Sequence, residues 1–340
     1  WTLKYLNRMS AVAILVSLLL LALLSIIFYF KFDMGGGTRP SSSSSSTSSM
    51  PLTISRSNIV VGIFDDQGYD DLGPSSSLAS LTPTLSAMAG DGVTLSNFYT
   101  APSCTPSRAA FLTGLHSVQL GVHSDVDATA PWGVPSAFTL LPQHLKTLGY
   151  STHLVGKWHL GHHEASLLPT SRGFDSFFGF YTDAVDQTTH VSPSSCKAAD
   201  TEGDGSASPA CYTDLALFQE GADFVSGDWR SFEVPTEKSG TLLTDDLAAH
   251  AESLIQDRAT MGQPLFLVLS FPSATTLSEV TPSLEARFPA LAAVPDSRKT
   301  TAASTALVDA AMATVVQATK DQSIFDETFF LVFSDNGGSL

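Results

Sequence analysis

The chain has 340 residues, of which only 15% are charged, and its formal net charge is −16. This length can bury a sizeable core, either as one large α/β domain or as two smaller domains. The negative charge and the lack of a basic stripe argue against nucleic acid as a partner. An anion-binding site in this chain therefore has to be local, built from a few basic side chains or a bound cation.

The N-terminal part of the chain is predicted to tether a folded domain to a membrane. Residues 11–30 form an apolar run interrupted only by two serines, long enough to cross a bilayer core of roughly 30 Å as a helix. A cleaved signal peptide is the competing interpretation, but no small-x-small cleavage site follows Phe30. We therefore expect a cytosolic stub and uncleaved signal-anchor in residues 1–34 and a flexible Gly/Ser-rich linker in residues 35–56.

This topology predicts a secretory-pathway protein. Two basic residues precede the apolar run, and the charges directly after it nearly cancel, so the N-terminus is expected in the cytosol. The rest of the chain then faces the lumen or the outside of the cell, or is secreted or lysosomal if the segment is cleaved. In such a compartment three cysteines suggest one disulfide and one special thiol, and Cys196 and Cys211, which bracket a polar loop, are the natural pair.

Two short apolar runs, residues 58–64 and 329–333, have the pattern of buried strands, and both end in polar residues. These residues are Asp65 and Asp66 after the first run, and Asp335 and Asn336 after the second. Adjacent aspartates alone are often only a turn. Two strands that deliver three carboxylates and an amide to one edge of an open α/β sheet instead make an all-oxygen site, which suits calcium or magnesium.

A distinctive string follows at residues 104–114, Cys-Thr-Pro-Ser-Arg-Ala-Ala-Phe-Leu-Thr-Gly. The proline suits a first helical turn and the glycine ends an apolar run, so Cys104 is expected at a helix N-terminus. Backbone N–H groups and the helix dipole favour an anion there, and Arg108, one turn along, can bind the same oxyanion. An isolated cysteine would more often be a buried structural residue.

A second string occupies residues 149–161, Gly-Tyr-Ser-Thr-His-Leu-Val-Gly-Lys-Trp-His-Leu-Gly. Lys157 and His159 are two residues apart, so in extended backbone they point the same way. A lysine beside a histidine can bind an oxyanion and move a proton, although a lone pair of this kind is more often a surface feature.

Both strings resemble signatures of the type I sulfatases, C-x-P-S-R followed by L-T-G, and G-Y-x-T-x-x-x-G-K-W-H-L-G. The order of the predicted elements is most similar to the arylsulfatase B branch of that family. The resemblance implies an alkaline-phosphatase-like α/β fold, a large mixed sheet flanked by helices, for a catalytic domain over residues 57–340. It also implies that this domain is incomplete at its C-terminus and lacks the small C-terminal subdomain of the family.

The resemblance further implies a sulfuric ester hydrolase that cleaves aryl or carbohydrate sulfates. In the family the cysteine is oxidised to formylglycine by the formylglycine-generating enzyme, one hydroxyl of the hydrated aldehyde attacks the sulfate sulfur, and the second later expels sulfate. By this resemblance Cys104 becomes the formylglycine, Arg108 and Lys157 neutralise the sulfate, and His159 attends the formylglycine hydroxyls. The implied ligands of one calcium ion are Asp65, Asp66, Asp335 and Asn336.

The chain departs from the family pattern after the strand expected at residues 264–271. Arylsulfatase B-like enzymes carry a sulfate-contacting histidine there, and Thr275 stands at the aligned position. Because threonine donates a hydrogen bond but cannot supply a proton near pH 7, we expect weaker protonation of the leaving group. The family also expects a lysine after the Asp335–Asn336 pair, and the sequence ends at Leu340 before it.

These departures keep two alternatives open. The first is a membrane-tethered, non-catalytic protein that binds sulfate without turnover. The second is a phosphate or phosphonate monoester hydrolase, because the same fold hosts those reactions.

Overall fold

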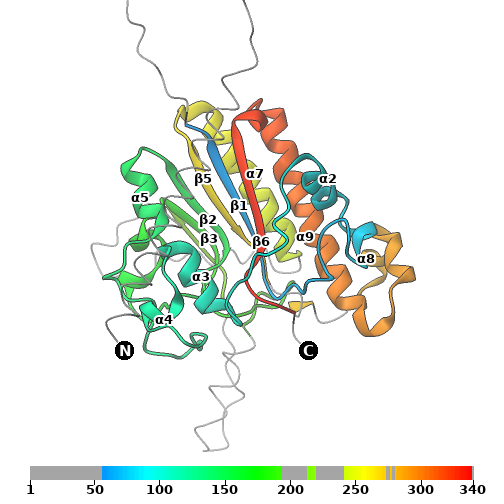
Figure 1. The fold of residues 1–340 in the computed structure, drawn as a ribbon, viewed down its shortest axis with the longest axis horizontal. Coiled ribbons are helices and arrows are strands. Elements are labelled where there is room, and N and C mark those ends of the chain that lie inside the picture. The colour runs from blue at the N-terminus through cyan, green and yellow to red at the C-terminus, as the bar shows by residue number, and fades with distance from the viewer. Residues whose placement is uncertain (1–55, 193–212, 220–240, 273–275, 278–279, 339–340) are drawn as a thin grey trace, which may run out of the picture. The chain divides into compact units, whose positions relative to one another are not determined.

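A six-stranded mixed sheet forms the centre of the fold (Figure 1), with the strand order β4-β3-β2-β5-β1-β6. The computed structural model describes residues 56–192, 213–219, 241–272, 276–277 and 280–338. The strands are β1 (Asn58–Phe64), β2 (Ser151–Lys157), β3 (Ser176–Phe180), β4 (Ala216–Gln219), β5 (Leu265–Ser270) and β6 (Thr328–Ser334). All neighbouring pairs run parallel except β3 and β4, which are antiparallel. The strands predicted from the two apolar runs are confirmed as β1 and β6.

Helices cover both faces of this sheet (Figure 1). One face carries α3 (Cys104–Thr113), α4 (Ser117–Leu120) and α5 (Leu141–Thr147). The other face carries α2 (Pro83–Asp91), α7 (Leu243–Met261) and α9 (Asp296–Asp321), and α8 (Pro282–Arg287) packs beside α9. Short 3-10 turns lie at Ala79–Leu81, Ala165–Leu167, Pro169–Arg172, Pro289–Ala293 and Phe325–Glu327. The mixed α/β sheet flanked by helices is therefore confirmed.

The core consists of two apolar layers, one on each side of the sheet. Successive side chains of a strand point to opposite faces. Along β1, Val60 and Phe64 accordingly pack in one layer with α7 and α9, whereas Val61 and Ile63 pack in the other with α3. Because β1 is buried on both faces and paired with β5 and β6, the position of its carboxyl end is fixed between the ends of these two strands.

Two glycines let the inner strands approach closely at that edge. Gly156 in β2 has φ +109°, and a Cβ there would lie 1.8 Å from the carbonyl oxygen of Ser270. A Cβ on Gly179 in β3 would lie 2.0 Å from the carbonyl oxygen of Gly156. Only glycine fits such contacts, and Lys157 directly follows at the end of β2.

Several predictions from the sequence fall outside the described residues. These are the signal-anchor of residues 1–34, the linker up to residue 55, the Cys196–Cys211 pair and Thr275. In the part of the chain that the structure describes, no helix is long and apolar enough to cross a bilayer. The anchor, the disulfide and the role of Thr275 stay predictions.

Candidate active site

The carboxyl ends of four strands bring the polar residues of the site together. Parallel strands end at the same edge of a sheet, which is where open α/β folds bind ligands. Lys157 is the last residue of β2 and Ser270 the last of β5. The aspartates that follow β1 and the Asp-Asn pair that follows β6 meet because Phe64 pairs with Ser334 at the end of the two strands.

Cys104 is the first residue of α3, and its thiol lies among charged groups. The helix runs to Thr113 and ends at Gly114 in the left-handed conformation, as its sequence predicted. Cys104 is 8% exposed. Its Sγ–H donates to Oδ1 of Asp65 at 3.3 Å, and Sγ accepts from Nζ of Lys157 at 3.2 Å. Burial raises the pKa of this thiol in spite of Lys157, so the group is a neutral thiol at ordinary pH.

Two buried cations hold the carboxylates in place. Nζ of Lys157 contacts both carboxylate oxygens of Asp65, at 2.9 and 2.7 Å. Arg108 contacts Oδ2 of Asp335 through Nε at 2.9 Å and Nη2 at 2.8 Å, and Oδ1 of Asp65 through Nη2 at 3.4 Å. Its Nη1 donates to the carbonyl of Lys157 and to the hydroxyl of Ser270. Burial opposes both positive charges, but the neighbouring aspartates outweigh it and raise the pKa of each cation.

The oxygen atoms at this edge fit a hard cation. A carboxylate oxygen of Asp65, one of Asp66 and Sγ of Cys104 lie within 4.8 Å of one another. Oδ1 of Asn336 is buried and has no hydrogen-bond partner among the residues that the structure describes, and Nδ2 of Asn336 donates to Asp66 at 2.5 Å. Burial raises the pKa of Asp65 to about 7, because Lys157 and Arg108 only partly offset burial and the other carboxylates. A cation bound by these oxygens would favour the ionised carboxylate and satisfy the amide oxygen.

His159 follows β2 with its backbone in the left-handed region, at φ 55°. Its Nε2 lies 3.0 Å from the carbonyl oxygen of Val126, and its Nδ1 is buried with no hydrogen-bond partner in the described part of the chain. Burial, with Lys157 and Arg108 nearby, lowers the pKa of this imidazole well below its ordinary value. His159 is therefore a neutral base whose Nδ1 carries the lone pair.

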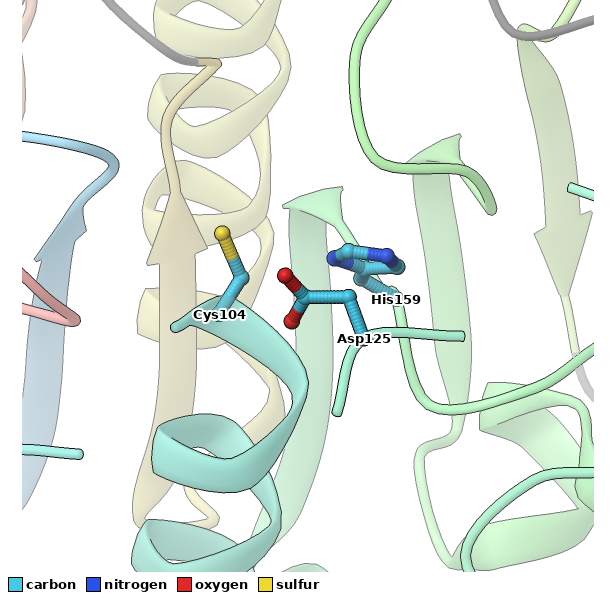
Figure 2. Close-up of side chains that lie close together, drawn as sticks. All are labelled: Cys104, Asp125 and His159. Carbon is cyan, nitrogen blue, oxygen red and sulfur yellow. The ribbon is translucent and has the colours of Figure 1, made fainter. Parts of the chain in front are cut away.

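Asp125 is a residue of the site that the sequence did not reveal (Figure 2). It lies on an exposed loop, and its Oδ1 accepts from the backbone N–H of Thr105 in the first turn of α3, at 2.8 Å. A carboxylate oxygen of Asp125, Sγ of Cys104 and a ring nitrogen of His159 lie within 4.8 Å of one another. No motif surrounds Asp125, so only the capping of α3 in the folded chain brings it to the site. The sequence analysis also missed Ser270, which ends β5 and contacts Arg108, because no motif surrounds it either.

Comparison with known proteins identifies the family. The family model described as Sulfatase matches residues 57–340. The chain is 32% identical to mouse (Mus musculus) arylsulfatase J over 286 residues, which cover 84% of this chain and 43% of that protein. It is 31% identical to human (Homo sapiens) arylsulfatase G over 290 residues, which cover 83% of this chain and 51% of that protein. The chain thus spans about half the length of these relatives.

A solved structure shares the fold. The crystal structure of Ps i-CgsB in complex with k-i-k-neocarrahexaose matches 84% of this chain and 59% of its own, with a TM-score of 0.68 and 25% sequence identity. The alkaline-phosphatase-like sulfatase fold expected from the two signature strings is therefore confirmed. Since the family model covers well over half of the chain, this chain belongs to the sulfatase family.

Proposed function

We propose that the chain is the catalytic part of an arylsulfatase-like sulfuric ester hydrolase, with formylglycine made from Cys104. One observation carries the proposal, the position of the cysteine. It opens helix α3 with Nζ of Lys157 at 3.2 Å from Sγ, and Arg108 lies one turn along the same helix. A residue there faces two cations at the positive end of the helix dipole, which is where the sulfur of a sulfate ester has to sit for attack.

The proposed cation is a single calcium ion, held by the oxygen ligands Asp65, Asp66, Asp335 and Asn336. Its support is the unsatisfied buried oxygen of Asn336 and the raised pKa of Asp65 among neighbouring carboxylates. A bound calcium ion supplies positive charge to the oxygens of the sulfate group. Calcium is favoured over zinc because all four proposed ligands are oxygen donors.

The chain's own residues divide the work of hydrolysis, in which an ester and water give an alcohol or phenol and sulfate. Lys157 and Arg108 bind the sulfate oxygens and neutralise charge that develops on them. Formylglycine supplies two hydroxyls on one carbon, one for attack and one for the later release of sulfate. The free Nδ1 of His159 takes a proton from this group, because Nε2 is engaged with the carbonyl of Val126.

A sulfated aryl compound or glycan is the proposed substrate class. Ps i-CgsB, which shares this fold, was solved with k-i-k-neocarrahexaose bound, which supports a sugar chain as one option. The expected substitution of Thr275 for a family histidine supports an aryl sulfate as the easier substrate, because a phenolate leaves without protonation.

The first test is the mass of the peptide that contains Cys104. The protein is expressed through a secretory pathway that has the formylglycine-generating enzyme. We expect the side-chain sulfur and two hydrogens to be exchanged for one oxygen, and the purified protein to hydrolyse an aryl sulfate. The Cys104→Ala variant should fold and show no turnover. An unmodified thiol without turnover would favour the non-catalytic sulfate-binding alternative, and faster cleavage of an aryl phosphate would favour the phosphate hydrolase.

For the location of this domain we propose the lumenal or extracellular side of a membrane. The proposal rests on the apolar run at residues 11–30 and its flanking charges. Protease added to sealed microsomes should leave residues 57–340 intact and digest them after the membrane is permeabilised. Digestion in sealed microsomes would reverse the proposed orientation.

A further inference from the structure

We propose that the unconverted protein, with a thiol at residue 104, binds a thiophilic divalent cation such as Zn²⁺ through Cys104, Asp125 and His159. Sγ, a carboxylate oxygen and Nδ1 are the three ligand atoms, and water takes the fourth position. The proposed calcium ligands Asp65 and Asp66 form a separate group with Cys104 and do not belong to this site. It does not depend on the proposed hydrolase activity.

The three side chains converge from separate parts of the fold. Cys104 opens α3, Asp125 lies on the loop that caps this helix, and His159 follows β2. Figure 2 shows the Asp125 carboxylate between the Cys104 sulfur and the His159 ring. Sγ of Cys104, a carboxylate oxygen of Asp125 and a ring nitrogen of His159 lie within 4.8 Å of one another. Tetrahedral zinc requires separations of about 3.3–3.8 Å between such ligands. The exposed loop of Asp125 can supply the small movement that closes the difference.

The hydrogen bonding of His159 leaves one of its ring nitrogens available as a metal ligand. The residue is 1% exposed, and its Nδ1 is buried without a hydrogen-bond partner among the described residues. Its Nε2 lies 3.0 Å from the carbonyl oxygen of Val126. In metal sites the second ring nitrogen of a histidine ligand usually donates its N–H to such an acceptor, which leaves the lone pair on the nitrogen that binds the metal. The buried, unsatisfied Nδ1 is thus the observation, besides the cysteine, that points to a ligand.

The donor set and the charges select a thiophilic cation over calcium. Sulfur and imidazole nitrogen are ligands of zinc, whereas calcium takes oxygen. Binding replaces the proton of the Cys104 thiol by the metal and releases that proton to solvent. The thiolate and the Asp125 carboxylate then balance the two positive charges of the cation. Lys157, which also contacts Sγ, already has its charge paired with Asp65.

Conversion of Cys104 would abolish this site. Formylglycine has no sulfur, so the converted protein retains only the Asp125 and His159 ligands. The thiol and aldehyde forms of the protein should therefore differ in their affinity for zinc, whichever substrate the converted form takes.

The test uses the full chain expressed without the formylglycine-generating enzyme, in excess Ca²⁺ to saturate the oxygen ligands. Co²⁺ is titrated first as a spectroscopic substitute, and Zn²⁺ is then titrated calorimetrically. We expect one equivalent to bind, with a cobalt–thiolate charge-transfer absorption that the Cys104→Ala variant lacks. Asp125→Asn should weaken Zn²⁺ binding by roughly tenfold or more, while Asp127→Asn, on the same exposed loop, should not change it. Asparagine at position 125 keeps an oxygen that accepts from Thr105, so the cap of α3 is retained.

Three results would overturn the proposal. These are Co²⁺ binding without the thiolate absorption, equal Zn²⁺ affinity in the Cys104→Ala variant, and equal affinity in the Asp125→Asn variant. Failure of the proposed function would appear separately, as a missing aldehyde or missing ester hydrolysis in protein expressed with the modifying enzyme.

Discussion

Replacing Lys157 by methionine should destabilise the fold through the charge it leaves behind. Lys157 is 2% exposed, and its Nζ contacts both oxygens of Asp65 at 2.9 and 2.7 Å. Methionine fills nearly the same space without a charge. Asp65 would keep Arg108 at 3.4 Å and the Cys104 thiol at 3.3 Å, with the Asp335 carboxylate nearby.

The expected cost is about 3–5 kcal/mol above pH 7, the usual range when one partner of a buried ion pair is removed. Burial raises the pKa of Asp65 to about 7 even with Lys157 present, and loss of the lysine raises it further. Below that pKa the carboxyl takes up a proton in the folded state and the unpaired charge disappears. The cost of Lys157→Met should therefore shrink as the pH falls from 8 to 6.

The assay is denaturant unfolding of the two proteins in chelator at pH 8 and pH 6. Lys146→Met is the matched control, because Lys146 pairs with Asp175 at 2.7 Å while the two side chains are 37% and 24% exposed. That partly exposed pair should contribute only about 0.2–1 kcal/mol. A Lys157→Met cost equal to that of the control at pH 8, or the same at both pH values, would refute the reasoning.

Three further predictions concern the cation, a histidine and a glycine. Excess chelator should lower the melting temperature, and unchanged melting in chelator contradicts the metal site. The Asp66→Asn variant should show a smaller effect of chelator, and asparagine suits the left-handed backbone at this position, where φ is 57°. Burial holds the pKa of His153 below 6.5, so unfolded protein binds the proton first and stability falls as the pH drops below 6.5. When the melting temperature is measured against pH, His153→Gln should make this decline shallower, whereas His144→Gln, at an exposed position, should leave it unchanged. Equal slopes for the His153→Gln variant and the unchanged protein would contradict the prediction. Gly156→Ala should cost about 3 kcal/mol or more in denaturant unfolding, because its Cβ would lie 1.8 Å from a carbonyl oxygen of β5, whereas Gly90→Ala, with open space around it, should be nearly neutral.

The sequence predicted the strands of the site better than their arrangement. The runs at residues 58–64 and 329–333 are predicted as strands because each is a short, mainly apolar run followed by polar residues, and this signal is local. That β1 and β6 are neighbours, with Phe64 opposite Ser334, depends on contacts across more than two hundred residues. The expectation that the aspartates after these two strands and Asn336 share one sheet edge came from the rule that open α/β sheets bind ligands at the carboxyl ends of their strands, and it did not say which strands are neighbours.

The polar contacts within the site were mostly beyond the reach of the sequence. Lys157 and Arg108 were expected to bind an anion, and the structure pairs them with Asp65 and Asp335. Asp125 lies in an exposed loop without periodic pattern or motif, so nothing local distinguishes it from other surface aspartates. It reaches Cys104 only because the first turn of α3 has unsatisfied N–H groups that a side chain from another segment can cap.

The charges of the site imply that an anionic substrate binds only together with a cation. The carboxylates of Asp65, Asp66, Asp335 and Asp125 outnumber the cations Lys157 and Arg108 by two, and the whole chain has a net charge of −16. A divalent cation brings the local balance to neutral. At about 5 Å and an effective dielectric constant of about 20, each pair of unit charges interacts by roughly 3 kcal/mol. Calorimetric binding of inorganic sulfate should therefore be detectable in excess calcium and lost in chelator, and equal binding in both would show that the two basic side chains suffice.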